Sequence, residues 1–206
     1  MKKISESAVR RLSLYLRLLQ EAEAAGSDTI SSDELAARGG TTSAQVRKDL
    51  SLFGSFGKRG MGYSVRELLR EIRAILGLTR AWNVALIGAG KIGSALFSYR
   101  DFAARGFHIR AVFDTDPRKL GEAWGALKVR PDEELDRALR EEDIDIAIIA
   151  VPADAAQGVV DRVVQAGVKA ILNFAPVRPR LPRGVTIRNV DMTLELEGLS
   201  FALAGR

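Results

Sequence analysis

Apolar residues in the first third of the chain recur at intervals of three and four, which predicts amphipathic helices. The first helical pattern runs up to Gly26, where glycine readily takes the left-handed conformation of a helix cap. Ser31 and Glu34 have the spacing of a capping box that opens a second helix, and Thr42 and Gln45 repeat it for a third. Two short capped helices separated by a glycine turn are the outline of a helix-turn-helix.

The third predicted helix, residues 43–53, has one apolar and one polar face. Val46, Leu50 and Phe53 fall on the side that would point inward. The outward positions carry side-chain types that read base edges and phosphates in a major groove, namely Gln45, Arg47, Lys48 and Ser51. A solvated helix face would look the same, so the segment that follows decides between the two interpretations.

Residues 54–63 contain four glycines, apolar residues between them, and the adjacent cations Lys58 and Arg59 near the middle. This pattern predicts a short hairpin with a basic tip. A helix-turn-helix followed by such a hairpin is a winged helix, whose wing can place Lys58 or Arg59 against phosphates or in a minor groove. The sequence therefore indicates DNA binding by this domain.

From residue 82 onward the pattern changes to buried strands that alternate with helices, which predicts an α/β fold with a Rossmann-like, doubly wound parallel sheet. The expected strands are 84–87, 109–113, 144–151, 169–173 and 185–189, and the expected helices are 94–104, 132–140 and 153–166. We expect a winged-helix domain at 1–78, a nucleotide-binding domain at 79–190 and a C-terminal dimerisation helix at 191–206.

A glycine-rich turn follows the first of these strands directly. Gly88, Gly90 and Gly93 enclose Lys91 and Ile92 in a GxGxxG pattern, which permits a tight turn and close approach of the backbone to a pyrophosphate. The next strand ends in Asp114, which would accept hydrogen bonds from a ribose diol and repel a 2′-phosphate. This context favours NADH and NAD+ over their phosphorylated forms, although a doubly wound domain without a nucleotide can carry the same glycines.

In open α/β sheets, ligands lie beyond the carboxyl ends of the strands. The residues at the later strand ends are therefore candidates for the nicotinamide side of the site: Val151, Pro152, Asn173, Ala175, Pro176 and Met192. Each of them also fits an ordinary passage from strand to loop.

Composition narrows the chemistry. The chain has no cysteine and one histidine, which excludes disulfides, thiol nucleophiles and a histidine-based metal cluster. Residues 1–78 carry 13 Lys and Arg against 9 Asp and Glu, while residues 79–206 carry 18 against 17, so the basic excess lies in the first part. No apolar run reaches the length of a membrane span and the first residues lack a secretory signal, so we expect a cytoplasmic protein.

A hydride-transfer enzyme on this scaffold would need a proton donor or acceptor beside the nicotinamide. His108 starts the second strand, at the opposite end of the sheet from the expected cofactor, and no Tyr-x-x-x-Lys pair or nucleophile elbow is present. We therefore expect a cofactor that is bound without reacting and acts as a signal, and no enzyme. The alternative is an NAD-dependent oxidoreductase whose N-terminal domain serves dimerisation.

Taken together, the segment 45–51, the glycine-rich wing, the GxGxxG turn, residues 173–177 and the closing 199–201 resemble the Rex family of redox-sensing transcriptional repressors over essentially the whole chain. The resemblance implies a homodimer that binds a two-fold operator when NADH is scarce and leaves it when NADH is abundant, while NAD+ competes for the pocket. A regulator of similar build that senses coenzyme A is a further alternative.

The resemblance also implies a relay and a dimer contact. Matching the family's motifs places an arginine, a tyrosine and an aspartate of the switch at Arg17, Tyr99 and Asp191. Asp191 would pair with Arg17 in the DNA-binding state and with Tyr99 when reduced nicotinamide is present. The apolar C-terminal helix would be domain-swapped into the partner subunit, and Met192 stands where a side chain covers the nicotinamide.

Overall fold

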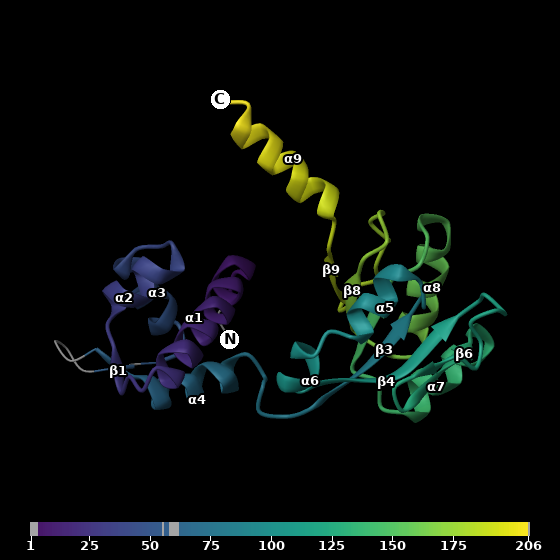
Figure 1. Cartoon of the computed structure of the whole chain (residues 1–206), viewed down its shortest axis with the longest axis horizontal. Helices are drawn as coiled ribbons and strands as arrows, with labels where there is room; N and C mark the ends of the chain where they lie inside the picture. The colour runs from purple at the N-terminus through teal and green to yellow at the C-terminus, as the bar shows by residue number, and fades with distance from the viewer. Residues whose placement is uncertain (1–3, 55, 58–61, 206) are drawn as a thin grey trace. The chain divides into compact units, whose positions relative to one another are not determined.

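The computed structural model describes residues 4–54, 56–57 and 62–205 of the chain. The chain folds as two compact units, Met1–Arg80 and Ala81–Arg206. Figure 1 labels most of the helices and strands of both.

The N-terminal unit is built from helices that begin at predictable caps. They are α1 (Glu6–Ala24), α2 (Ser32–Gly39), α3 (Ser43–Ser51) and α4 (Val65–Ile75). The capping box of Ser31 and Glu34 is confirmed, because each side chain bonds the backbone N–H of the other. Thr42 caps α3 by accepting from the Gln45 N–H at 3.2 Å. Because both caps fix where their helices begin, α3 starts at a defined point after α2.

Two short strands complete this unit. β1 (Thr29–Ile30) pairs antiparallel with β2 (Tyr63–Ser64), and the sequence analysis had missed β1. Gly57 and Gly62 lie close together, because a Cβ added to Gly57 would lie 2.5 Å from the Gly62 carbonyl oxygen. The predicted cations Lys58 and Arg59 lie outside the described residues.

Asp49 on α3 is the centre of a polar cluster inside this unit and is 1% exposed. Its carboxylate accepts hydrogen bonds from Arg11 Nε at 2.6 Å and Nη2 at 2.7 Å, from Tyr15 Oη at 3.0 Å and from Gln45 Nε2 at 2.8 Å. Burial alone raises the pKa of Asp49, but the bonds from Arg11, Gln45 and Tyr15 bring it below its ordinary value. The same burial, with the bond to Asp49, raises the pKa of Tyr15 to about 12. The cluster thus ties α3 to α1.

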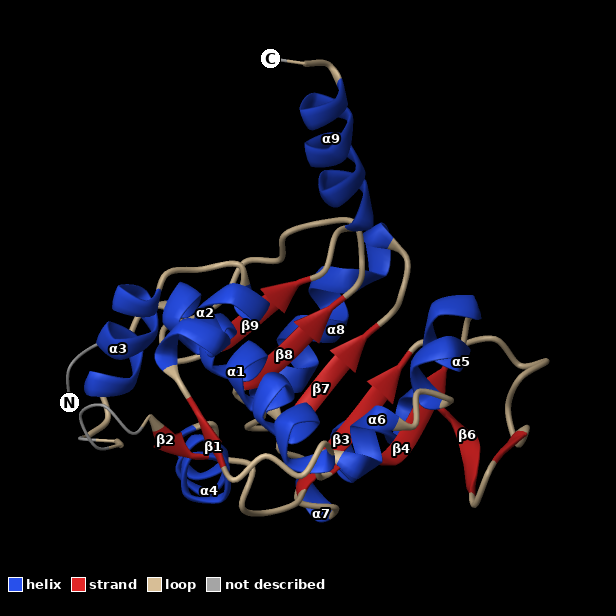
Figure 2. Ribbon diagram, turned by 60° about the vertical axis from the view of Figure 1, so that its left-hand side comes forward, coloured by secondary structure: helices blue, strands red, loops and turns tan. Residues whose placement is uncertain are grey.

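The C-terminal unit contains a sheet in the order β5-β6-β4-β3-β7-β8-β9, parallel except for β5. The parallel strands point the same way in Figure 2. Their bounds are β3 (Trp82–Ile87), β4 (Phe107–Asp114), β6 (Leu127–Pro131), β7 (Ile146–Ile149), β8 (Ala170–Asn173) and β9 (Thr186–Asn189), with β5 (Ala123–Trp124) at the edge.

Helices cover both faces of this sheet, which confirms the predicted doubly wound architecture. Alternate residues of β3 enter different cores: Ala85 and Ile87 pack with α7 (Leu135–Glu141) and α8 (Ala153–Gln165). Val84 and Leu86 pack on the other face, beside α5 (Lys91–Phe97) and α6 (Asp101–Ala104). A strand buried on both faces reads as a continuous apolar run, which is why β3 was predictable.

Two expectations for this unit need correction. The helix expected at 94–104 is two helices, because α5 starts at Lys91 and ends at Phe97 with Ser98 as its C-cap, and α6 begins at Asp101. The backbone hydrogen bond after Ser98 runs from the Tyr99 N–H to the Leu96 carbonyl, three residues back instead of four. The helix expected at 132–140 begins with a 3-10 turn, η1 (Asp132–Glu134), and continues as α7. β5 and β6 were missed because only Val129 is fully buried in them, so they carry little apolar signal.

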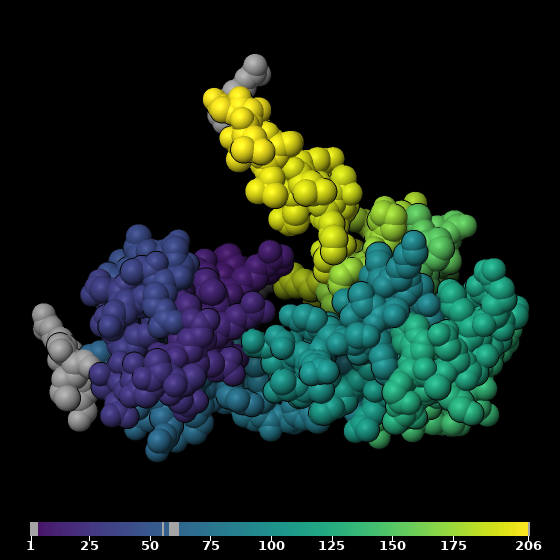
Figure 3. All heavy atoms as spheres, in the orientation of Figure 1, coloured from purple at the N-terminus to yellow at the C-terminus, as the bar shows by residue number. Residues whose placement is uncertain are grey.

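The last helix, α9 (Met192–Leu203), is apolar and exposed. Its side chains are uncovered on the face that Figure 3 shows, in yellow. The large apolar residues that are at least half exposed are Met192, Leu194, Leu196, Leu199, Phe201 and Leu203. Each described helix is too short or too polar to span a bilayer.

Substitution Asp49→Asn tests the buried cluster. We expect it to lower the free energy of unfolding by about 2 kcal/mol at neutral pH, because a charge-assisted bond is lost. Since the pKa of Asp49 is depressed in the folded protein, its contribution is full above the unfolded value of 3.8 and disappears as the pH falls through the folded value. Urea unfolding followed by circular dichroism, repeated from pH 7 downward, measures the difference between wild type and variant.

The matched control is Glu71→Gln, which removes an exposed ion pair with Arg70 on α4. It should change the unfolding free energy by less than about 1 kcal/mol. A loss in Asp49→Asn that is no larger than in this control, or that persists unchanged in acid, would contradict the assigned role.

Candidate functional site

The glycine turn after β3 is required by backbone crowding. Gly88 has φ of +104°, and a Cβ there would lie 2.4 Å from the Ala150 carbonyl oxygen. A Cβ at Gly93 would lie 2.0 Å from the Gly88 carbonyl oxygen. Around Gly90, by contrast, an added Cβ would meet nothing within 4 Å. Gly88 and Gly93 therefore permit close approaches between backbone segments that a side chain would block. Gly90 leaves open space beside the turn.

Asp114 lies at the end of β4, next to this turn. Its Oδ2 accepts from the Ala89 N–H at 2.7 Å and from Lys119 Nζ at 2.9 Å, and its Oδ1 accepts from the Asp116 N–H at 2.8 Å. Burial raises the pKa of Asp114, and the bonds from Asp116, Lys119 and Ala89 outweigh this and hold it below its ordinary value. The site therefore presents an ionised, acceptor-only carboxylate.

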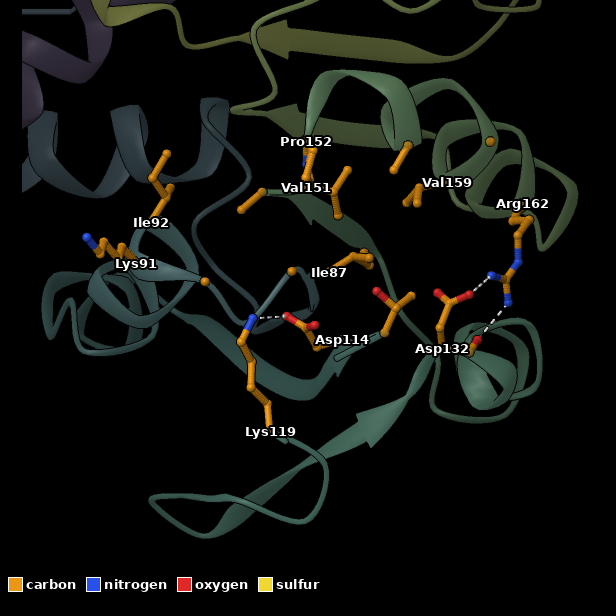
Figure 4. A pocket seen from close by; sticks show the side chains of 16 residues that line it. Ile87, Lys91, Ile92, Asp114, Lys119, Asp132, Val151, Pro152, Val159 and Arg162 are labelled. Atoms are coloured by element: carbon orange, nitrogen blue, oxygen red, sulfur yellow. Dashed lines mark hydrogen bonds and ion pairs between the residues drawn. The ribbon is translucent and has the colours of Figure 1, made fainter. Parts of the chain in front are cut away.

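A pocket of about 860 Å³ opens at the carboxyl ends of β3, β4 and β7. This volume is in the range of small-molecule and cofactor sites. Figure 4 shows side chains around it. It is lined by seven residues of the predicted nucleotide site: Gly88, Gly90, Lys91, Ile92, Asp114, Val151 and Pro152. It is also lined by residues that the sequence analysis missed: Ile87, Thr115, Lys119, Asp132, Ala150, Ala155, Gly158, Val159 and Arg162.

Five of the missed residues come from two parts of the chain. Asp132 follows β6, a strand that was not predicted, and Ala155, Gly158, Val159 and Arg162 lie on α8. A strand end or a helix face becomes part of a pocket only through the order of strands in the sheet. Lys119 had a usable signal, because it stands five residues after Asp114 and can reach back to it.

Five predicted residues do not line this pocket: Gly93, Asn173, Ala175, Pro176 and Met192. Asn173 is 0% exposed, and its amide donates to the Val177 carbonyl at 2.9 Å and to Asn189 Oδ1 at 2.8 Å. Its Oδ1 accepts from the Ala175 N–H at 3.0 Å. These bonds shape the loop after β8, so Asn173 has a structural task here. Met192 is 68% exposed at the start of α9.

The predicted DNA-reading face is only partly free. Gln45 is occupied by its bond to Asp49, and Arg47 Nη1 donates to the Ser32 hydroxyl at 2.9 Å. Lys48 and Ser51 are exposed, and the Ser51 hydroxyl donates to the Lys48 carbonyl at 2.8 Å. The exposed face of α3 thus presents the cations of Arg47 and Lys48.

The three residues of the expected relay occupy different positions. Arg17 is exposed on α1. Tyr99 is 52% exposed, makes a T-shaped ring contact with Phe102, and donates from its hydroxyl to Asp101 Oδ2 at 3.4 Å. Asp191 caps α9 by accepting from the Thr193 N–H at 3.0 Å. In the described residues, Tyr99 and Asp191 therefore have separate partners.

Nothing among the described residues suggests a metal centre, since no group of three His, Asp or Glu side chains is placed to hold an ion. His108 lies near the start of β4, whereas the pocket opens at the carboxyl end of that strand.

Comparison with known proteins agrees with these two units. Residues 3–51 match the family “Putative DNA-binding protein N-terminus”, and residues 79–177 match the family “CoA binding domain”. The redox-sensing transcriptional repressor Rex of Carboxydothermus hydrogenoformans is 50% identical over 199 residues, covering 97% of this chain and 96% of the relative.

Two solved structures are similar over the full length. RSP in complex with beta-NAD+ and operator DNA has a TM-score of 0.94 and 38% identity, covering 98% of this chain and 94% of that one. RSP in complex with beta-NADH has a TM-score of 0.90 and 36% identity, covering 98% and 95%.

Fold and site together define a two-domain protein in which a winged-helix unit is joined to a Rossmann-like, doubly wound unit with a ligand pocket. Within that class, the chain belongs to the Rex family of redox-sensing transcriptional repressors.

The crowding at the turn leads to a test by two alanine substitutions. Gly93→Ala should lower the unfolding free energy by about 1–3 kcal/mol, because its Cβ must displace the Gly88 carbonyl. Gly90→Ala should leave it unchanged or raise it by up to about 1 kcal/mol, because Gly90 has φ of −80° and open space around it. Urea unfolding monitored by the fluorescence of Trp82 and Trp124 reports on this unit. Equal losses in both variants would contradict the assignment.

Proposed function

We propose that this protein is a redox-sensing transcriptional repressor that binds operator DNA through its N-terminal unit and leaves it when NADH occupies the pocket of its C-terminal unit. It would thereby report the NADH/NAD+ ratio. The observation that carries the proposal is the pocket bounded by the glycine turn and the Asp114 carboxylate, in a chain of the Rex family. RSP, similar over the full length, has been crystallised with beta-NADH and with beta-NAD+ and operator DNA.

The pocket fits a dinucleotide without a 2′-phosphate. Gly90 offers open space where a pyrophosphate could approach the backbone. Asp114 supplies an acceptor for ribose hydroxyls, and its negative charge disfavours a phosphate at the same position. When bound, the nicotinamide supplies the difference between oxidised and reduced states that the protein senses. Lys91, Ile92, Val151 and Pro152 would line the bound nucleotide.

The nicotinamide end would lie toward β8 and α9. There Ala175 and Pro176 follow Asn173 in the loop that Asn173 shapes. Met192 is exposed at the start of α9 and would cover the ring once that helix is docked. Gly93 would contribute indirectly, by letting α5 pack against the turn.

Operator binding would use α3 and the segment that follows it. Arg47 and Lys48 would contact phosphates or base edges, with Gln45 and Ser51 beside them on the same helix. Lys58 and Arg59 would contact the DNA as the tip of the wing.

The apolar helix α9 supports a homodimer. Leucine and phenylalanine side chains that are more than half exposed over a whole helix are costly in water and mark an interaction surface. The helix would be exchanged with a second copy of the chain, as a swapped element. Two copies would place two reading helices on a two-fold operator. A protein that binds operator DNA would act in the cytoplasm, where that DNA lies.

The relay of Arg17, Tyr99 and Asp191 would couple the pocket to α1. Tyr99 follows α5 and Asp191 precedes α9, so both stand at element ends that a bound cofactor can shift. Asp191 would form an ion pair with Arg17 in the DNA-binding state. When NADH binds, it would instead accept a hydrogen bond from the Tyr99 hydroxyl.

We propose that the pocket binds its ligand without catalysing a reaction, because its carboxylates are paired with cations. Asp114 is bonded to Lys119, and Asp132 to Arg162, so both carboxylates are held by cations of the site. A regulator that senses coenzyme A is the second candidate, favoured by the match of residues 79–177 to the CoA binding domain family.

A fluorescence-anisotropy titration on a library-selected duplex at fixed salt, without cofactor, with NADH and with NAD+, tests the proposal. We expect sequence-specific binding that is lost with NADH and kept with NAD+.

In Lys48→Ala, the affinity for the duplex should fall roughly tenfold, and the slope of log affinity against log salt concentration should fall by about 1. Arg73→Ala on α4 removes an equal charge from the same unit and should change neither. In Asp191→Asn, NADH should no longer release the duplex. Failure of any duplex to bind specifically, or steady turnover of NADH with a carbonyl substrate, would refute the proposal.

Asp114→Ala separates the two candidate ligands. Under the proposal it should weaken NADH binding about tenfold or more, because a hydrogen bond to a charged acceptor is lost. Isothermal titration calorimetry with NADH and with coenzyme A measures both. A variant that keeps its NADH affinity, in a protein that binds coenzyme A more tightly, would favour the second candidate.

A further inference from the structure

The ligand pocket continues beyond Asp114, into a region between the end of β6 and α8. In Figure 4, Asp114 and Asp132 lie along one side, with Ile87, Val151 and Val159 along the opposite side. A region with apolar side chains on one side and carboxylates on the other suits an aromatic group that carries hydrogen-bond donors at one edge. Because Asp114 would hold a ribose, the base attached to that ribose would enter this region.

Asp132 is held in a defined orientation by Arg162. The Arg162 guanidinium donates from Nη1 to Asp132 Oδ2 and from Nη2 to the Asp132 carbonyl at 2.7 Å. The same guanidinium donates from Nε and Nη2 to Asp136 at 2.9–3.2 Å. Asp132 Oδ1 accepts no hydrogen bond from a described residue. One oxygen of this carboxylate is thus fixed by α8, and the other is available to a ligand.

Asp132 and Asp136 differ in one respect that matters. Both are bonded to Arg162, but Asp132 lines the pocket and Asp136 is not among the lining residues. Asp132 is therefore the carboxylate of this network that can reach a ligand in the pocket.

We infer that Asp132 is a specificity-determining residue for the base of the bound nucleotide, accepting a hydrogen bond from the exocyclic amine of adenine. The inference rests on the proposed function and deepens it. An ionised carboxylate can only accept, so it selects an edge with an N–H donor and repels a carbonyl oxygen in the same place. Arg162 acts as a positioning residue, because it holds Asp132 by two hydrogen bonds.

The test compares NADH with reduced nicotinamide hypoxanthine dinucleotide, in which a carbonyl oxygen replaces the amine. Both are titrated calorimetrically into the full-length protein. Wild type should bind NADH about tenfold more tightly or better, because one partner of the bond is a charged group. In Asp132→Asn the amide can donate to the carbonyl, so the preference should disappear or reverse. In Asp136→Asn, the matched control, the preference should remain.

The outcomes separate this inference from the proposed function. Equal binding of the two nucleotides to wild type, which needs no variant, overturns the inference while leaving NADH sensing intact. An unchanged preference in Asp132→Asn, or an equal loss in Asp136→Asn, also overturns it, because the network would then be structural. If wild type binds neither nucleotide, the proposed function itself fails and the inference fails with it.

Discussion

The site in the C-terminal unit depends on one crowded crossing of the backbone. At the end of β3 the chain passes so close to Ala150 and to itself that Gly88 and Gly93 have no room for a side chain. This contact sets α5 directly on the strand and brings the ends of β3 and β7 together. The pocket opens beside this crossing, and Gly88 and Gly90 are among its lining residues.

Charges around that crossing are arranged in pairs. Lys119 holds Asp114, and Arg162 holds Asp132, so the walls of the pocket present carboxylates whose orientation is fixed before any ligand arrives. A fixed acceptor loses little freedom on binding, which favours affinity and selectivity together.

In the N-terminal unit, the Asp49 carboxylate is also fixed by its partners, since it joins α3 to Arg11 and Tyr15 of α1. A displacement of α1 would therefore be transmitted to α3.

Much of the fold was predictable because its signals are local. The helix caps at Ser31 and Thr42 and the buried strands β3, β4 and β7 follow from neighbouring residues alone. β5 and β6 escaped prediction because both are short and only partly buried, with Val129 as their one fully buried residue. The break between α5 and α6 escaped because the residues around it carry no glycine or proline that would mark a helix end.

The sequence by itself determined the two-part architecture, the glycine turn, Asp114 and the cations of α3, since each is set by residue type and spacing along one segment. Tertiary structure decided which side chains share the pocket. Asp132 and Arg162, 30 positions apart, meet because η1 leads into α7, and α7 and α8 pack on the same face of the sheet. Packing also placed Asn173 where it holds the loop after β8, and it left the apolar side chains of α9 exposed. Such outcomes depend on strand order and packing, which bring distant residues together and which no local pattern encodes.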